Sequence, residues 1–173
     1  MDDLRNKLFY EQKNGYDLID TQERIAVEEY AKGYIEYLDN SRTEREAVNN
    51  AIALAEQNGF VEYSYGMELK PGMKIYKNNR GKALLAATIG TPPITDGVTI
   101  AAAHIDSPRI DLKPVPLYES TELAYFDTRY YGGIKKYQWV AIPLALHGTV
   151  IRKDGTSINV CIGEDDNDPV FCI

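Results

Sequence analysis

The spacing of apolar residues changes near Phe60, and this change constrains what the chain can fold into. Before Phe60, apolar side chains recur at steps of three and four residues, which is the period of one helix face. After Phe60, short apolar runs alternate with polar turns that contain glycine, a pattern typical of strands. With 173 residues, of which 44% are hydrophobic, the chain is long enough for roughly one domain with its own core. The pattern predicts an α/β protein.

Two helices are predicted in the first third of the chain. The first begins at a capping box formed by Asp20 and Glu23. The second is capped by Ser41 with Glu44 and stops before Gly59, where a glycine commonly ends a helix. We expect the first helix to bury one apolar face, which comprises Val27, Tyr30, Ala31, Tyr34, Ile35 and Leu38.

Strands and tight turns are predicted in the rest of the chain. Residues 73–76 and 83–88 flank a polar turn with a glycine, which indicates a β-hairpin. The apolar run at residues 98–103 predicts a strand that ends at His104. Further strands are predicted around a turn at residues 153–155: they comprise residues 140–147, 150–152 and 157–162.

The pair His104 and Asp106, at the end of the predicted strand, is the main candidate for a functional site. Residues two apart on an extended segment point to the same face, so the two side chains can share one pocket. There the imidazole can bind a metal, while the carboxylate orients it through the other ring nitrogen. The alternative is that His104 is a polar residue with its hydrogen bonds satisfied and binds no metal, which is the more common role of a histidine at a strand end.

The rest of a metal site is hard to find in this sequence. A catalytic zinc ion needs at least three protein ligands, and the chain has only two histidines, His104 and His147. The sequence contains no His-Glu-x-x-His and no Cys-x-x-Cys motif. His147 lies in an apolar strand pattern, so we expect a structural role for it. Gly132 and Gly133 are a secondary candidate for cradling a ligand, although a glycine pair more often forms a turn.

Two longer runs resemble a known family. Residues 103–116 are AHIDSPRIDLKPVP, and residues 130–139 are YYGGIKKYQW. Together they resemble the amino-terminal part of the aspartyl aminopeptidase and vacuolar aminopeptidase I family of zinc metallopeptidases. The resemblance implies that His104 ligates one of two zinc ions and that Asp106 is the catalytic-site carboxylate supporting it. The other ligands of the family, and its general-base glutamate, lie downstream, so we expect this chain to be a truncated portion.

The resemblance also implies a domain organisation. Residues 1–116 correspond to the amino-terminal part of a catalytic domain in which helices accompany a mixed sheet. Residues 117–173 correspond to the start of an inserted, β-rich domain that mediates subunit assembly and helps to cover the active site. A homo-oligomer is therefore expected.

The function implied by the resemblance is hydrolysis of single amino-terminal residues from peptide substrates by the full-length enzyme. We expect the 173-residue chain alone to bind zinc weakly and to lack peptidase activity. The alternative is a non-catalytic module, derived from the same fold, that assembles or binds peptides. Residues 132–136 depart from aspartyl-specific members, which carry a longer glycine run, so the preferred amino-terminal residue stays open.

Charge and hydropathy exclude some classes of partner. The formal net charge of −7 argues against binding to nucleic acid or to an anionic membrane, both of which favour a basic surface. No run approaches the roughly 20 apolar residues that span a bilayer. Residues 1–5 are polar, unlike the start of a secretory signal, so a cytoplasmic protein is expected.

Overall fold

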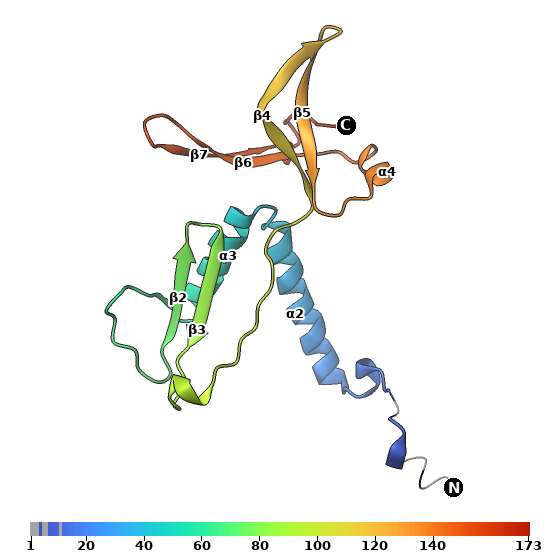
Figure 1. The fold of residues 1–173 in the computed structure, drawn as a ribbon. Coiled ribbons are helices and arrows are strands. Elements are labelled where there is room, and N and C mark those ends of the chain that lie inside the picture. The colour runs from blue at the N-terminus through green and yellow to red at the C-terminus, as the bar shows by residue number, and fades with distance from the viewer. Residues whose placement is uncertain (1–3, 5–6, 11) are drawn as a thin grey trace. The chain divides into compact units, whose positions relative to one another are not determined.

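The computed structural model describes residue 4, residues 7–10 and residues 12–173 (Figure 1). The prediction that residues 1–5 are not a secretory signal falls mostly outside the described residues, because only Leu4 of these five is described. The contacts divide the chain into two units, Met1–Asp39 and Asn40–Ile173. The predicted α/β class is confirmed, because helices and a mixed sheet are both present. Every helix in the described ranges is too short or too polar to cross a lipid bilayer.

The first unit contains the 3-10 helix η1 (Gly15–Asp17) and the long helix α2 (Thr21–Asp39). Its predicted capping box is confirmed: the N–H of Glu23 donates to the Asp20 carboxylate at 2.8 Å, and the N–H of Asp20 donates to the Glu23 carboxylate at 3.0 Å. The expected buried face is wrong, because no residue of α2 is buried. The described residues that precede α2 in this unit are too few to cover the apolar side of a 19-residue helix.

The second unit begins with helix α3 (Glu44–Gln57), whose cap is Thr43 and not the predicted Ser41. The Thr43 hydroxyl accepts a hydrogen bond from the N–H of Glu46 at 3.3 Å, and the Glu46 carboxylate accepts one from the N–H of Thr43 at 2.8 Å. Ser41 is buried, and its hydroxyl accepts a hydrogen bond from the Asn50 side chain, so it has a different partner. The helix stops before Gly59, as predicted.

One mixed sheet follows α3. It consists of β1 (Val61–Glu62), β2 (Lys74–Asn79) and β3 (Ala83–Thr88), in the order β1-β2-β3. β1 runs parallel to β2, whereas β3 runs antiparallel to it. The predicted hairpin is therefore confirmed, with its turn at Arg80 and Gly81, both of which have positive φ.

The core of the second unit lies where α3 packs against this sheet (Figure 1). The hydroxyl of Tyr76 donates to the carboxylate of Glu56 at 2.6 Å and so joins β2 to the helix. This hydrogen bond, together with burial, raises the pKa of Tyr76 to about 12. The buried apolar residues among those described are few: they are Ala47, Val48, Ile75 and Tyr76.

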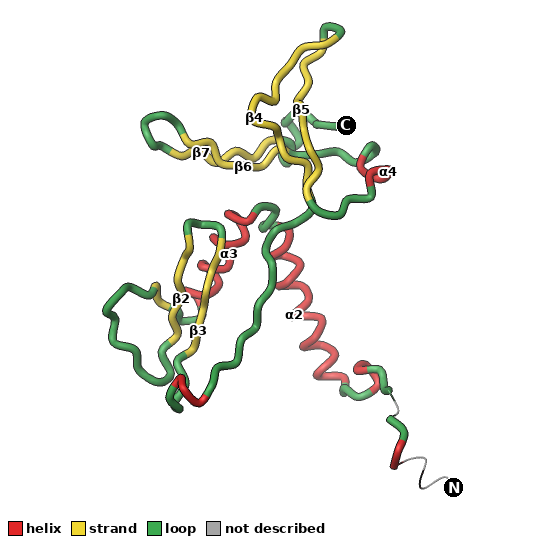
Figure 2. Tube along the Cα trace, viewed as in Figure 1, coloured by secondary structure: helices red, strands yellow, loops and turns green. Residues whose placement is uncertain are grey.

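Residues 98–103 do not form the predicted strand. They follow the 3-10 helix η2 (Ile94–Asp96) as a loop, which Figure 2 shows between β3 and β4. A strand exists only when its backbone pairs with a neighbour, and no described strand pairs with this segment. Its apolar side chains are accordingly exposed, with 78% of Ile100 accessible to solvent.

A long antiparallel hairpin, which sequence analysis did not predict, follows this loop. It consists of β4 (Arg109–Ser120) and β5 (Leu123–Tyr131). The register shifts between Leu112 and Leu117, a stretch that contains two prolines, which lack the N–H needed for pairing. The expected domain boundary between residues 116 and 117 falls inside β4 and stays a prediction.

A third hairpin follows near the end of the chain. Strands β6 (Leu146–Ile151) and β7 (Ser157–Ile162) pair antiparallel around the predicted turn, in which Gly155 has a φ of +86°. The predicted strand over residues 140–147 is wrong for most of its length. The short helix α4 (Lys136–Trp139) and a turn precede β6, which starts only at Leu146.

Candidate metal-binding site

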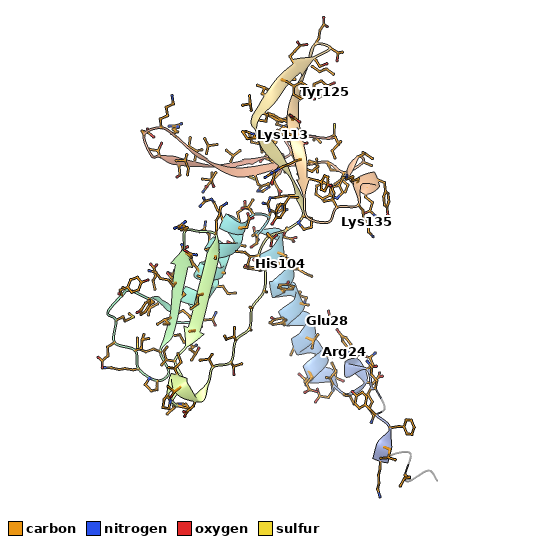
Figure 3. All side chains as sticks on the ribbon, in the orientation of Figure 1. Arg24, Glu28, His104, Lys113, Tyr125 and Lys135 are labelled. Carbon is orange, nitrogen blue, oxygen red and sulfur yellow. The ribbon has the colours of Figure 1, made fainter. Side chains whose placement is uncertain are left out.

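His104 lies in the loop before β4 (Figure 3). The hydrogen bonds of its ring define which ring nitrogen is available to a ligand. Its Nδ1 lies 2.9 Å from the backbone oxygen of Asp106 and 3.0 Å from Oδ1 of the Asp106 carboxylate. Both oxygens only accept hydrogen bonds, so Nδ1 carries the proton. In the neutral imidazole the lone pair is then on Nε2, which has no hydrogen bond to any described residue.

His104 and Asp106 meet by a different route from the one that the sequence suggested. The alternation of side chains along a strand predicted that they share a face, but the segment is a loop and its bend brings them together. The His104 side chain is 82% exposed, whereas that of Asp106 is only 34% exposed. Their contact is thus observed, while their roles in metal binding and catalysis stay predictions.

Tyr131, the last residue of β5, holds the other side of the Asp106 carboxylate. Its hydroxyl donates to Oδ2 of Asp106 at 2.8 Å. This hydrogen bond is the largest influence on the pKa of Asp106, which lies below its ordinary value, and it raises the pKa of Tyr131. No role was predicted for Tyr131 from the sequence. The one feature that could have suggested a role is its position in residues 130–139, the second run that carries the family resemblance.

Two further contacts bring the end of β5 against the loop. The guanidinium of Arg109 lies 4.1 Å from the centre of the Tyr131 ring and pairs with Asp111 at 2.8 Å. Gly132 has a φ of +74°, and a Cβ on it would lie 3.4 Å from Cα of Pro108. This distance is ordinary van der Waals contact, so Gly132 lies beside Pro108, and its positive φ is what favours glycine at this position.

His147, the second histidine, is tied to carboxylates on both sides. Its Nδ1 lies 2.9 Å from Glu46 in the first turn of α3, and its Nε2 lies 3.0 Å from Glu164, which also pairs with Arg42. Only 12% of the side chain is exposed. Partial burial acts to raise the pKa of Glu46, but the hydrogen bonds from His147 and Thr43 outweigh it, so that pKa is lowered. These contacts fit the structural role expected for His147.

His104 and Asp106 fit the arrangement of one zinc ligand and its supporting carboxylate. A zinc-binding histidine presents one ring nitrogen to the metal while the other donates to a carboxylate or a carbonyl, which is the arrangement of His104. Within the described ranges, no group of three or more His, Cys, Asp or Glu side chains is arranged to hold a metal ion. His104 is thus a candidate ligand whose companions are not among the described residues.

Comparison with known proteins points to one family. The family model described as "Aminopeptidase I zinc metalloprotease (M18)" matches residues 37–173. A probable M18 family aminopeptidase 1 of Clostridium acetobutylicum is 50% identical over 172 residues, which cover 97% of this chain and 37% of that relative. The chain therefore spans little more than a third of the length of this curated relative.

Solved structures agree with this match. The crystal structure of aminopeptidase I from Borrelia burgdorferi aligns with a TM-score of 0.86 at 38% identity, over 93% of this chain and 40% of that one. The crystal structure of an M18 aminopeptidase from Thermotoga maritima aligns with a TM-score of 0.84 at 39% identity, over 95% of this chain and 36% of that one. The fold described above is shared by both.

Proposed function

Since this chain belongs to the M18 family of aminopeptidase I zinc metalloproteases, we propose that it forms the part of a zinc aminopeptidase that presents His104 to the metal. The observation that carries the proposal is the His104 ring, whose Nδ1 donates to Asp106 while its exposed Nε2 faces no described partner. Asp106 supports the site by fixing this tautomer and the direction of the ring. The reaction is hydrolysis of the bond that follows the amino-terminal residue of a peptide.

Two zinc ions are proposed for the complete site, and bound zinc would lower the pKa of a water molecule and polarise the peptide carbonyl. The residues of this chain contribute binding and orientation. Asp106 holds the proton on Nδ1 of His104, so that the Nε2 lone pair is kept free. Because Asp106 is partly shielded and hydrogen bonded on both oxygens, it stays in place while Nε2 is bound.

The 173-residue chain is proposed to be inactive by itself. A catalytic zinc ion takes three protein ligands and keeps an open position, and no group of three or more His, Cys, Asp or Glu side chains among the described residues is arranged to hold a metal ion. The remaining ligands and the general base are proposed to come from residues beyond these 173, in keeping with the 37% share of the curated relative that the chain covers.

A role in assembly is proposed for the residues from Leu117 onward. From Leu117 onward, the hairpin of β4 and β5 leaves large apolar side chains on its surface, among them Leu117 with 64% and Leu123 with 57% of their area exposed. Apolar surface of this extent is typical of an interface with another chain or with more of the same protein. These side chains support the proposed homo-oligomer and the proposed start of an inserted domain.

The test is hydrolysis of a panel of amino-acid anilides. The native zinc-loaded protein is compared with its His104→Ala variant and with a Lys113→Ala control, which removes only an exposed ion pair with Asp127. We expect the His104 variant to lose both zinc and activity, whereas the control keeps both. A His104→Ala protein that retains zinc and full activity would overturn the proposal.

The same panel applied to the 173-residue chain in added zinc tests the proposed need for further residues. We expect no hydrolysis. Hydrolysis by this chain that disappears in His104→Ala would show that the site completes itself from residues within the 173.

A further inference from the structure

The Asp106 carboxylate is hydrogen bonded on both of its oxygens. Oδ1 accepts from Nδ1 of His104 at 3.0 Å, while Oδ2 accepts from the hydroxyl of Tyr131, 25 residues away in the sequence, at 2.8 Å. A carboxylate held by one partner alone can rotate about its terminal torsion, which is broad for aspartate. With both oxygens engaged, the plane of the carboxylate is fixed, and so is the direction in which it holds the imidazole.

We propose that Tyr131 is a positioning residue that acts through Asp106 to aim Nε2 of His104 at the metal. The inference rests on the proposed function, because it requires His104 to be a zinc ligand. Neither the hydroxyl nor the ring of Tyr131 needs to touch zinc or substrate. Its contribution is to reduce the number of orientations that the exposed His104 side chain samples before zinc binds.

Tyr131 can do this because it is itself held in place. The Arg109 guanidinium lies 4.1 Å from the centre of its ring, a distance suited to a cation–π contact. Arg109 in turn pairs with Asp111 at 2.8 Å and with Glu44, the first residue of α3, at 3.1 Å. Arg109 and Tyr131 are also paired residues of the antiparallel ladder between β4 and β5. The hydroxyl therefore reaches Asp106 from a supported ring.

The backbone beside Tyr131 shows the same close association with the ligand loop. Gly132 lies beside Pro108: a Cβ on it would be in van der Waals contact with the proline, 3.4 Å from its Cα. Pro108 is two residues from Asp106, so the loop is held against β5 by backbone packing as well as by the hydroxyl. The two sequence runs that carry the family resemblance thus meet at this contact.

The neighbouring Tyr130 supplies a matched control. It precedes Tyr131 on β5, pairs with Ile110 and therefore points to the opposite face of the hairpin. Its ring contacts Nζ of Lys136 at 4.1 Å, and its hydroxyl has no hydrogen bond to any described residue. Tyr131→Phe and Tyr130→Phe each remove one hydroxyl and keep the ring. They differ in whether that hydroxyl reaches Asp106.

The experiment measures how fast the native zinc-loaded protein loses zinc to an excess of dipicolinate, together with kcat and KM for an anilide substrate. Loss of an outer partner of a zinc ligand commonly weakens binding about 10- to 100-fold, and because Tyr131 acts one residue further out we expect zinc loss to be about 3 to 10 times faster in Tyr131→Phe. We also expect kcat to fall with KM unchanged. Tyr130→Phe should match the parent protein.

A second measurement separates positioning from a general loss of stability. The imidazole ¹⁵N spectrum of the zinc-free protein is recorded, and the signals of His104 are identified as those absent from His104→Ala. We expect the parent protein to show a proton fixed on Nδ1. In Tyr131→Phe the Asp106 backbone oxygen, 2.9 Å from Nδ1, still accepts this proton, but the carboxylate is less well held, so we expect a larger share of the other tautomer. A variant that merely melts at a lower temperature would keep the parent signals.

The outcomes distinguish this inference from the proposed function. If His104→Ala keeps its zinc, the proposed function fails and the role of Tyr131 fails with it. If His104→Ala loses zinc while Tyr131→Phe matches Tyr130→Phe in zinc loss and in its ¹⁵N spectrum, only the inference about Tyr131 is wrong.

Discussion

At the scale of single residues, the candidate site depends on contacts that hold an exposed loop in one conformation. His104 is largely exposed, and such a side chain ordinarily samples several rotamers. Its bonds to Asp106, and the close packing of Gly132 on Pro108, restrict the loop from two directions. The loop is therefore ordered by its neighbours on β5 and not by regular secondary structure of its own.

The Gly132→Ala variant tests the backbone conformation beside this loop. Alanine is disfavoured at a φ of +74°, so we expect a loss of about 1–2 kcal/mol in the free energy of unfolding. Gly133→Ala is the matched control, since Gly133 has no atom within 4 Å of a built Cβ. Urea denaturation of the native protein gives both values. Equal stabilities of the two variants would contradict the need for a glycine at the positive φ of residue 132.

At the scale of elements, His147 connects the hairpin of β6 and β7 to the start of α3. Its ring lies between Glu46 of the helix and Glu164, which follows β7. Glu46 also completes the capping box with Thr43, so a single carboxylate serves both the helix end and the hairpin contact. These contacts keep the pKa of Glu46 below its ordinary value.

A pH dependence of stability follows from the lowered pKa of Glu46. A carboxyl whose pKa is lower in the folded protein contributes stability above its unfolded pKa, and this contribution is lost as the pH falls through the folded value. We expect Glu46→Gln, which retains a capping side chain, to be less stable than the parent at neutral pH. The difference should shrink as the pH falls below 4.5, the ordinary value for Glu46.

Chemical denaturation between pH 3 and pH 7, about the range over which carboxylates titrate, measures this difference. Glu29→Gln is the control, because Glu29 is exposed on α2 and pairs with the exposed Lys32. We expect the control to differ from the parent by less than about 1 kcal/mol throughout. If the loss of stability in Glu46→Gln does not change with pH, the ion pair of Glu46 with His147 does not contribute to that loss.

Local features of the elements could be predicted from the sequence, whereas features that depend on distant partners could not. The capping box of Asp20 and Glu23 involves four consecutive residues, and it is confirmed. At the next helix the predicted box of Ser41 and Glu44 is replaced by one of Thr43 and Glu46. The structure favours Thr43 because Ser41 bonds to Asn50, nine residues away, which no local pattern reveals.

The strands show the same limit. The hairpins at residues 74–88 and 146–162 could be predicted, because the glycines of their turns are visible in the sequence; both glycines have positive φ in the structure. The strand β4 contains two prolines that argue against pairing, yet the ladder resumes beyond them after a register shift. For the candidate site, the motif led to His104 and Asp106, but the contact with Tyr131 spans 25 residues and depends on the hairpin that was not predicted.

At the scale of the whole molecule, this chain leaves much apolar surface uncovered. In the unit Asn40–Ile173, for example, Tyr65, Leu85 and Ile100 are all exposed. Among the described residues, only Ala47, Val48, Ile75 and Tyr76 form a buried apolar core. Such a core stabilises only a small part of the chain.

We therefore expect the 173-residue chain in isolation to unfold with low cooperativity. Its urea m-value should lie well below that of a compact domain of the same length, because less surface is newly exposed on unfolding. Binding of a hydrophobic dye before denaturant is added should reveal the uncovered apolar side chains. A sharp two-state transition with a full-size m-value and no dye binding would be inconsistent with so small a core.

The most direct measurement is anomalous diffraction at the zinc edge from crystals of the native protein. We predict an anomalous peak about 2.0–2.1 Å from Nε2 of His104, with Nδ1 still bonded to Asp106. Zinc bound elsewhere with His104 free of metal, or zinc on Nδ1 with Asp106 displaced, would contradict the assignment of His104 as the ligand that this chain presents.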